Sequence, residues 1–327
     1  MPRLAVLSNA ASRGNARGRW ALWRAAAPDV VQAVTRHVDD VGEAVDALLA
    51  ADCDALAVDG GDGTLQSLLT HCLRHDLLER LPPLAVIPGG TTNMCAQDLS
   101  GTGRFGAALR ASLALRARPV ERWSLQERAL LVVEAGDASR HAGLFFGLGD
   151  LVRGVEAWQA SLRHGLLAGT VGVGVAVART AWGIARRRPP FDAATGVTLA
   201  CDDTPAAHLA LSALMVTTLE RLVLGMRPSW GDARGTLLCT SLVARPPRLL
   251  RTLPLALWGA GGRLRAEDGY ACTRAERVVV DLDERWLLDG EVIDAPGPLR
   301  ISASAPLRFV RLCETPAPWW RRDGELR

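Results

Sequence analysis

Two turns rich in glycine and threonine carry the clearest chemical signal in this sequence. The first, GGDGT at residues 60–64, follows the apolar run ALAV and precedes the helical pattern LQSLL. The second, IPGGTTN at residues 87–93, repeats the order of glycines, threonines and helix. Glycines let the backbone approach a ligand closely, and the exposed amides at a helix start attract anions. One such turn is often only a tight bend, but two on successive strands would line a cleft suited to phosphate.

Asp62, inside the first turn, changes what such a cleft would do. A carboxylate repels phosphate unless a divalent cation or a proton to be abstracted lies between them. Asp62 therefore indicates phosphate chemistry rather than phosphate binding alone. The alternative is that its carboxylate accepts hydrogen bonds from amides of its own turn.

The composition excludes several kinds of phosphate site. All 38 basic residues of the 327-residue chain are arginines, so no lysine-dependent phosphate loop, kinase lysine or Schiff base can be present. Phosphates must be bound by arginine, backbone amides or metal. The net charge of +3 argues neither for nor against nucleic acid, and we expect no nucleic-acid partner. Seven cysteines without a CxxC pair favour a reducing cytoplasm over a disulfide framework or a zinc site.

The first 118 residues alternate between short apolar strands and amphipathic helices. We expect strands at 3–9, 30–37, 54–61 and 83–90, and helices at 16–26, 39–51, 64–75 and from about Thr92. This pattern predicts an α/β, Rossmann-like domain with a mostly parallel sheet over residues 1–118. Ligands bind such sheets at the carboxyl ends of the strands. Both glycine turns fall at such ends.

Beyond Pro119 the pattern changes to strand-like runs separated by turn residues. Residues 119–312 therefore predict a mainly antiparallel β-sandwich domain with helical insertions near 150–187 and 246–258, and residues 313–327 a C-terminal tail. The uncharged segment 165–178 is shorter than a membrane span requires. We expect it to form a buried helix or one that lies at a membrane surface.

The combination of GGDGT with PGGTTN resembles the catalytic domain of diacylglycerol kinases, sphingosine kinases and bacterial soluble lipid kinases, with NAD kinases as more distant relatives. The loop SNAASRG at residues 8–14 stands where that family has an Asn-Pro-x-Ser-Gly phosphate loop, with Asn9 and Ser12 kept. Thr35 matches a family threonine near the nucleotide. LLDGEV at residues 287–292 supplies the family's Asp-Gly-Glu with Asp289 and Glu291, although a DG step by itself more often marks a hairpin.

The resemblance implies ATP in the cleft between two domains, with Glu291 as the base on the acceptor hydroxyl. Chemistry alone allows either Glu291 or Asp62 to take that proton. Mg²⁺ would be held by Asp62 and by Glu121, which replaces a family aspartate. Met94 and Gln97 depart from the family, which has a carboxylate and an arginine there. The expected nucleotide-binding residues are Asn9, Ser12, Thr35, Gly60, Gly61, Asp62, Gly63, Thr64, Gly89, Gly90, Thr91, Asn93 and Asp289.

The sequence therefore predicts a lipid kinase that uses ATP and Mg²⁺ and phosphorylates a diacylglycerol-like or sphingoid hydroxyl. The alternatives are a kinase of a soluble acceptor and a non-catalytic nucleotide- or lipid-binding protein. We expect a cytoplasmic, bacterial protein that acts on a lipid substrate at the inner face of the membrane. An edge strand of the second domain could support a homodimer.

Overall fold

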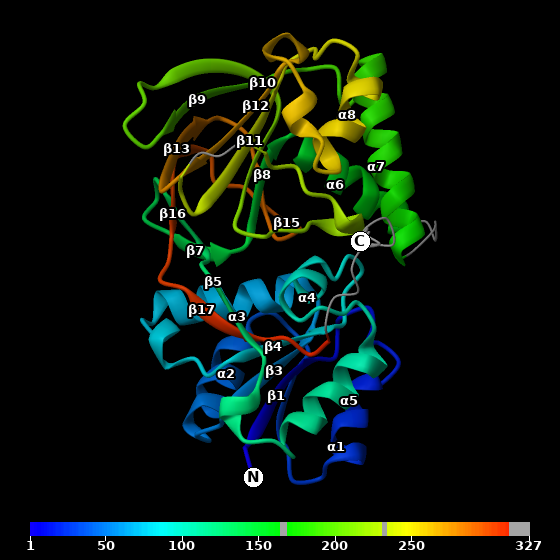
Figure 1. Ribbon diagram of the computed structural model, residues 1–327, viewed down its shortest axis with the longest axis vertical. Helices are drawn as coiled ribbons and strands as arrows, with labels where there is room; N and C mark the ends of the chain where they lie inside the picture. The colour runs from blue at the N-terminus through cyan, green and yellow to red at the C-terminus, as the bar shows by residue number, and fades with distance from the viewer. Residues whose placement is uncertain (164–168, 231–233, 314–327) are drawn as a thin grey trace, which may run out of the picture.

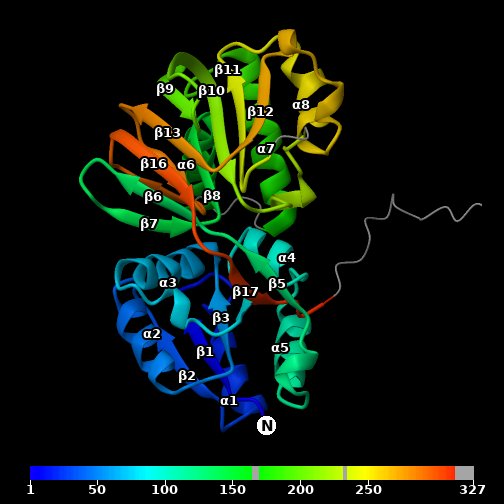
Figure 2. The ribbon, with the colours of Figure 1, turned by 60° about the vertical axis from the view of Figure 1, so that its left-hand side comes forward.

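The computed structural model describes residues 1–163, 169–230 and 234–313. Within these residues the strands form two sheets, and the two resulting domains are stacked along the long axis of the molecule (Figures 1 and 2). A six-stranded, mostly parallel sheet has the order β2-β1-β3-β4-β17-β5, and an eleven-stranded antiparallel sheet forms the second domain. The expected fold class, an α/β domain followed by a mainly antiparallel domain, is confirmed.

Helices bury both faces of the first sheet. Ala5 and Leu7 of β1 pack with helices α2 and α3, whereas Leu4 and Val6 pack on the side of α1 and α5. Burial of both faces explains the nearly continuous apolar runs of these strands. The strands are β1 (Leu4–Asn9), β2 (Val31–Thr35), β3 (Ala55–Gly60), β4 (Leu84–Pro88), β5 (Leu125–Arg128) and β17 (Leu307–Val310). The helices are α1 (Leu22–Ala26), α2 (Asp40–Ala50), α3 (Asp62–Arg74), α4 (Met94–Leu99) and α5 (Phe105–Leu115).

The helix expected at residues 16–26 begins later than predicted. A 3-10 turn starts at Arg19 and α1 at Leu22, because the chain after β1 first makes a loop over residues 10–18. Gly18 ends this loop with a φ of 79°, which favours glycine.

The long strand β10 (Ala207–Thr217) organises the second sheet. Along one side its first half pairs with β9 and its second half with β8, while β11 pairs along the other side. The sheet therefore divides at β10 and curls, so that Phe146 and Trp286 share one core with Val280 and Ile301. The other strands are β6 (Leu131–Ala135), β7 (Arg140–Gly143), β8 (Phe145–Gly149), β9 (Thr195–Cys201), β11 (Leu237–Val243), β12 (Tyr270–Ala275), β13 (Arg277–Leu282), β14 (Trp286–Leu288), β15 (Glu291–Ile293) and β16 (Gly297–Ala303).

Three helices accompany the second sheet: α6 (Asp150–Arg163), α7 (Gly169–Arg186) and α8 (Leu249–Leu257). Helix α7 contains most of the apolar segment 165–178, and residues 165–168 lie outside the described residues. Val173 of this helix is buried, whereas Val175 is exposed. None of the helices described in the structure has the length and apolarity needed to cross a bilayer.

The division expected at Pro119 does not coincide with the two sheets. Strands β5 and β17 lie beyond Pro119 but belong to the first sheet, where Phe309 of β17 pairs with Leu84 of β4 (Figure 2). The physical reason is that β4 would otherwise leave an unpaired edge of the parallel sheet. The chain therefore crosses between the domains twice. Of the expected tail, 313–327, only Cys313 is among the described residues.

The domains also share a core. Helix α3 packs against β7, and the Thr70 hydroxyl both accepts from the amide of Ala142 at 3.0 Å and donates to its carbonyl at 3.2 Å. The cluster of buried residues between α3 and the first sheet continues into the second domain through Leu144, Met215 and Leu222. This packing fixes the carboxyl ends of β3 and β4 next to the second domain.

Candidate active site

The two glycine turns lie in direct contact. The amide of Gly89 donates to the carbonyl of Gly60 at 2.7 Å. A Cβ atom added to Gly90 would lie 2.7 Å from the Cα atom of Gly61, closer than side chains are ever packed. The predicted adjacency of the turns is therefore confirmed, and glycine is required at this contact because backbone meets backbone.

Several amides of these turns have no acceptor among the residues that the structure describes. Asp62 and Gly63 begin α3, where the first amides of a helix lack intrahelical partners. Among the described residues, no hydrogen bond uses the amides of Thr91 or Thr92. Other amides are occupied, since the amide of Gly90 donates to Asn93 Oδ1 at 2.8 Å. The free amides of the two turns can bind phosphate oxygens.

The Asp62 carboxylate connects the first turn to the second. It accepts hydrogen bonds from the hydroxyl of Thr92 at 2.6 Å and from the amides of Met94 and Cys95 at 3.2 and 3.0 Å. These amides begin α4, so the carboxylate also lies at the positive end of that helix. The alternative that Asp62 accepts amides of its own turn is thus not what the structure shows; its partners belong to the other turn.

Asp289 and Gly290 form the hairpin turn between β14 and β15, with φ angles of 49° and 97°. The side chain of Asp289 is buried and accepts the amides of Leu144 at 3.0 Å and Phe145 at 2.9 Å. Burial and the nearby charge of Asp62 raise the pKa of Asp289 well above its ordinary value. The described contacts of Asp289 are therefore with the backbone between β7 and β8.

Glu291, directly after this hairpin, reaches the first turn from the second domain. A Cβ atom added to Gly63 would lie 2.8 Å from Glu291 Oε1. The residue is exposed as a whole, but its carboxylate end faces the start of α3, and desolvation raises the pKa of Glu291. The structure therefore brings together Asp62, Gly63 and Glu291 from two domains.

The residues expected at and after the end of β1, and at the end of β2, also lie at this edge of the sheet. Asn9 Nδ2 donates to the hydroxyl of Thr64 at 2.9 Å. The hydroxyls of Ser12 and Thr35 are buried, and neither has a hydrogen-bond partner within the described part of the chain. Unpaired buried hydroxyls at the end of β1 and β2 are suited to contact a ligand.

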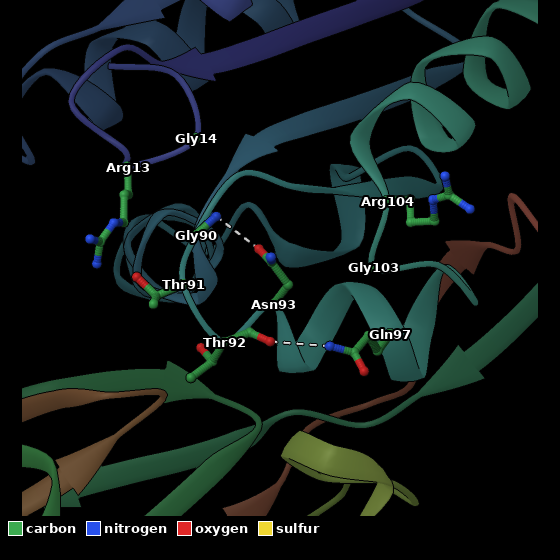
Figure 3. Close-up of a pocket in the computed structure, with 9 residues that line it drawn as sticks. All are labelled: Arg13, Gly14, Gly90, Thr91, Thr92, Asn93, Gln97, Gly103 and Arg104. Atoms are coloured by element: carbon green, nitrogen blue, oxygen red, sulfur yellow. Dashed lines mark hydrogen bonds between the residues drawn. The ribbon is translucent and has the colours of Figure 1, made fainter. Parts of the chain in front are cut away.

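A pocket of about 420 Å³ opens beside the second turn (Figure 3). Arg13 and Arg104 lie on opposite sides of it, and both are exposed (Figure 3). In the described ranges neither forms an ion pair. No motif in the sequence marks these two arginines, although the lack of lysine left arginine, backbone amides or metal as the groups that could bind phosphate. The lining residues are Arg13, Gly14, Gly90, Thr91, Thr92, Asn93, Gln97, Gly103 and Arg104.

Met94 and Gln97, which depart from the family pattern, each contact other parts of the protein. Met94 is buried in the core shared by the domains, and Gln97 Nε2 donates to the carbonyl of Thr92 at 3.1 Å. Asp98, which was not predicted as a site residue, is buried and accepts the amides of Glu220 and Arg221 from the second domain. No sequence signal marks Asp98, because its partners are 122 and 123 residues away.

The metal-binding role expected for Glu121 beside Asp62 stays a prediction. Glu121 is exposed in a 3-10 turn, and no hydrogen bond or ion pair of the described residues links it to Asp62. Nor do the described residues contain a group of three metal-ligating side chains. Mg²⁺ usually binds through one or two carboxylates plus substrate phosphates and waters. Asp62, beside free amides for phosphate, fits that mode; Glu121 has no observed role in it.

Comparisons with known proteins give a family match for the first domain and similar folds for the chain. Residues 3–124 match the family model of the diacylglycerol kinase catalytic domain. The fold is similar to two structures of a protein assigned as a diacylglycerol kinase from Bacillus anthracis str. Sterne. Their TM-scores are 0.65 and 0.63, each at 18% identity, covering 95% of this chain and 95% and 97% of theirs. A diacylglycerol kinase structure from the same organism has a TM-score of 0.60 at 17% identity, covering 95% and 96% of the two chains. No curated protein matches the sequence.

Proposed function

We propose that this chain, whose first domain matches the diacylglycerol kinase catalytic domain, transfers the γ-phosphate of ATP to a hydroxyl of a diacylglycerol-like or sphingoid lipid. The observation that carries the proposal is the position of Glu291. This carboxylate comes from the second domain and lies beside Gly63, at the amide end of α3. A base at the end of an anion-binding helix can accept the proton of a hydroxyl that attacks a bound phosphate.

In the proposed reaction the alcohol oxygen forms a bond to the γ-phosphorus, and the bond from that phosphorus to the bridging oxygen of ADP breaks. Glu291 accepts the hydroxyl proton. The amides of Gly63 and Thr91 bind phosphate oxygens, and Arg13 neutralises part of their charge. Phosphoryl transfer depends mainly on such alignment and charge stabilisation, so these groups suffice as the protein's part.

Mg²⁺ bound with ATP would supply further neutralisation of the phosphate charge. Asp62 is the residue of this chain that would hold it, since its carboxylate is fixed by three hydrogen bonds at the contact of the two turns. The same bonds hold Asp62 in one orientation before any ligand is present.

We also propose that the protein meets its lipid at the inner surface of the membrane. Trp182 of α7 and Trp258 after α8 are exposed, and α7 packs beside α8 (Figure 1). The guanidinium of Arg186 lies 4.5 Å from the centre of the Trp182 ring. Tryptophan and arginine together suit the interface of an anionic bilayer. Sedimentation with anionic vesicles tests this proposal, and a protein that stays in the supernatant would contradict it.

Labelled ATP and Mg²⁺, incubated with the protein and a total lipid extract, test the activity. We expect the wild-type protein to transfer label to a lipid and the Asp62→Asn variant to transfer none. Label only on water-soluble alcohols would indicate a kinase of a soluble acceptor. ATP binding without transfer to any acceptor would indicate a non-catalytic protein.

We also propose a homodimer that forms through a sheet edge, which analytical ultracentrifugation tests. Strands β12 and β15 are the candidate edges, because α3 covers β7.

A further inference from the structure

We propose that Arg19 is a positioning residue that holds three ligand-facing segments of the first domain in register. These segments are the loop at residues 10–18 after β1 and the two glycine turns after β3 and β4. Its expected effect on ATP rests on the function proposed above. The contacts that carry the proposal are all within the protein.

The Arg19 side chain contacts four elements at once. Its Nε donates to Asn15 Oδ1 at 3.0 Å, and its Nη2 donates to the carbonyl of Pro88 at 3.1 Å. The same Nη2 lies 3.5 Å from Asp59 Oδ1. The Cζ atom is 3.9 Å from the centre of the Phe105 ring, at the start of α5. One guanidinium thus joins the loop after β1 to the ends of β3 and β4 and to α5.

Buried partners fix the position of this guanidinium. Asp59 is fully buried, and its Oδ2 accepts the indole N–H of Trp23 at 2.9 Å. Its Oδ1 has no hydrogen-bond donor among the described residues and faces Arg19. A buried carboxylate is costly unless a cation accompanies it, so Asp59 and Arg19 hold each other in place. Asn15, also fully buried, donates to the carbonyls of Asn9 and Asp59, each at 3.1 Å.

This network sets the distance between the loop and the second glycine turn. The amide of Gly14 donates to the carbonyl of Gly89 at 2.8 Å. A Cβ atom added to Gly14 would lie 2.6 Å from Arg19 Nη2 and 2.8 Å from that carbonyl, so the loop has no room to shift inward. Arg13, the preceding residue, lines the pocket beside Gly90 and Thr91. Arg19 therefore determines where Arg13 lies relative to the free amides.

Hydrogen exchange in the absence of nucleotide tests the network directly. Arg19→Met removes the guanidinium, and Arg17→Met is the matched control, an exposed arginine of the same loop. We expect the amides of Gly14 and Gly89 to exchange at least ~10-fold faster in Arg19→Met than in the wild type, with amides of the second sheet unchanged. Arg17→Met should exchange as the wild type does. Arg19→Lys keeps the charge but not both hydrogen bonds, so its exchange should be intermediate.

Steady-state kinetics give the second measurement. Because Arg19 positions loops and does not reach the reacting atoms, the KM for ATP should rise ~10-fold or more while kcat changes less. Arg19→Lys should recover part of the KM. A folded Arg19→Met protein whose KM for ATP and whose Gly14 exchange both stay within about twofold of the wild type would overturn the proposal.

Arg19→Lys is the substitute variant if Arg19→Met does not fold, since it keeps a positive charge beside the buried Asp59 carboxylate but loses the guanidinium. Faster exchange at residues 14 and 89 supports the network, and unchanged exchange overturns it. If the wild type transfers no phosphate, the proposed kinase activity fails. The exchange difference between Arg19→Met and Arg17→Met still decides the role of Arg19.

Discussion

At the scale of residues, Asp62 and Glu291 lie at the same turn in unlike surroundings. Asp62 accepts three hydrogen bonds that join the two turns, whereas the carboxylate of Glu291 is partly desolvated against Gly63. Desolvation disfavours the charged form of a carboxylate, which raises the pKa of Glu291 and makes it the better candidate for the proton acceptor. The three hydrogen bonds of Asp62 make it the better candidate for an anchor of the turns.

Glu291→Gln should lower kcat at least ~100-fold, because the amide cannot accept the hydroxyl proton. Asp294→Asn is the control, an exposed carboxylate just after the same strand. Phosphate transfer to lipid measures both variants. Wild-type activity in Glu291→Gln would remove Glu291 from the reaction.

The pH dependence follows from the same carboxylate. Glu291 must be ionised to act as a base, and its pKa lies above the ordinary value of 4.5. As the pH falls through this raised pKa, kcat/KM should decline, at a higher pH than an unperturbed glutamate would give. The residual activity of Glu291→Gln should lack this acid limb. A pH profile identical in the wild type and Glu291→Gln would contradict the assignment.

Asp62→Asn should lose activity and also stability. The amide group that replaces one oxygen cannot accept from Met94 or Cys95, which leaves a buried donor unpaired at a cost of ~1–3 kcal/mol in the free energy of unfolding. Asp76→Asn, an exposed carboxylate two residues after the end of the same helix, is the control. Phosphate transfer to lipid measures the loss of activity, and urea unfolding measures the loss of stability. An unchanged free energy of unfolding would mean that the hydrogen bonds of Asp62 do not stabilise the protein.

The sequence indicates most of these residues but not all their partners. GGDGT and PGGTTN predict the turns because paired glycines at a strand end allow close backbone approach. Asp289 matches a family motif, yet its partners Leu144 and Phe145 could not be foreseen, since they lie 145 and 144 residues away. Glu121 was expected at the metal because it replaces a family aspartate, and this role stays a prediction for an exposed side chain.

At the scale of elements, the contact between the glycine turns depends on the lack of side chains. Gly90→Ala would place a methyl 2.7 Å from the Cα atom of Gly61 and force the turns apart. We expect the KM for ATP to rise ~10-fold or more. Gly106→Ala, whose added methyl would meet only Arg110 at 3.6 Å, is the control and should leave KM unchanged. A normal KM in Gly90→Ala would show that the spacing of the turns is not critical.

The junction of α3 and β7 offers a test of stability. Thr70→Val keeps the shape of the side chain but leaves the amide and carbonyl of Ala142 unpaired, which should cost ~1–3 kcal/mol in the free energy of unfolding. Ser67→Ala, one turn earlier, removes only a bond to the carbonyl of Gly63 and should cost less. Urea denaturation of both variants checks the difference, and equal losses would contradict a special role for this junction.

Periodicity predicted the elements of the first domain better than those of the second. The apolar run AGLFFGLG at residues 142–149 has the pattern of one strand, but the chain breaks at Leu144 into β7 and β8, because Asp289 accepts the amides there. Strands β5 and β17 were not expected in the first sheet. Local patterns do not report which sheet a short strand will join, since pairing partners are distant.

At the scale of the whole molecule, the two domains should unfold together. The buried cluster around α3 contains residues of both domains, and the chain crosses between them at β5 and β17. We expect a single calorimetric transition whose van't Hoff and calorimetric enthalpies agree. Two separated transitions would show that the shared core is not cooperative.

The position of β17 also has a consequence for synthesis. A ribosome releases the chain from its N-terminus, and the edge of β4 is not covered until residues 307–310 have emerged. During most of translation the nascent parallel sheet exposes that edge, a template for aggregation. Folding of the first domain is thus delayed until residues 307–310 have emerged, and chaperone demand should be greatest before that point.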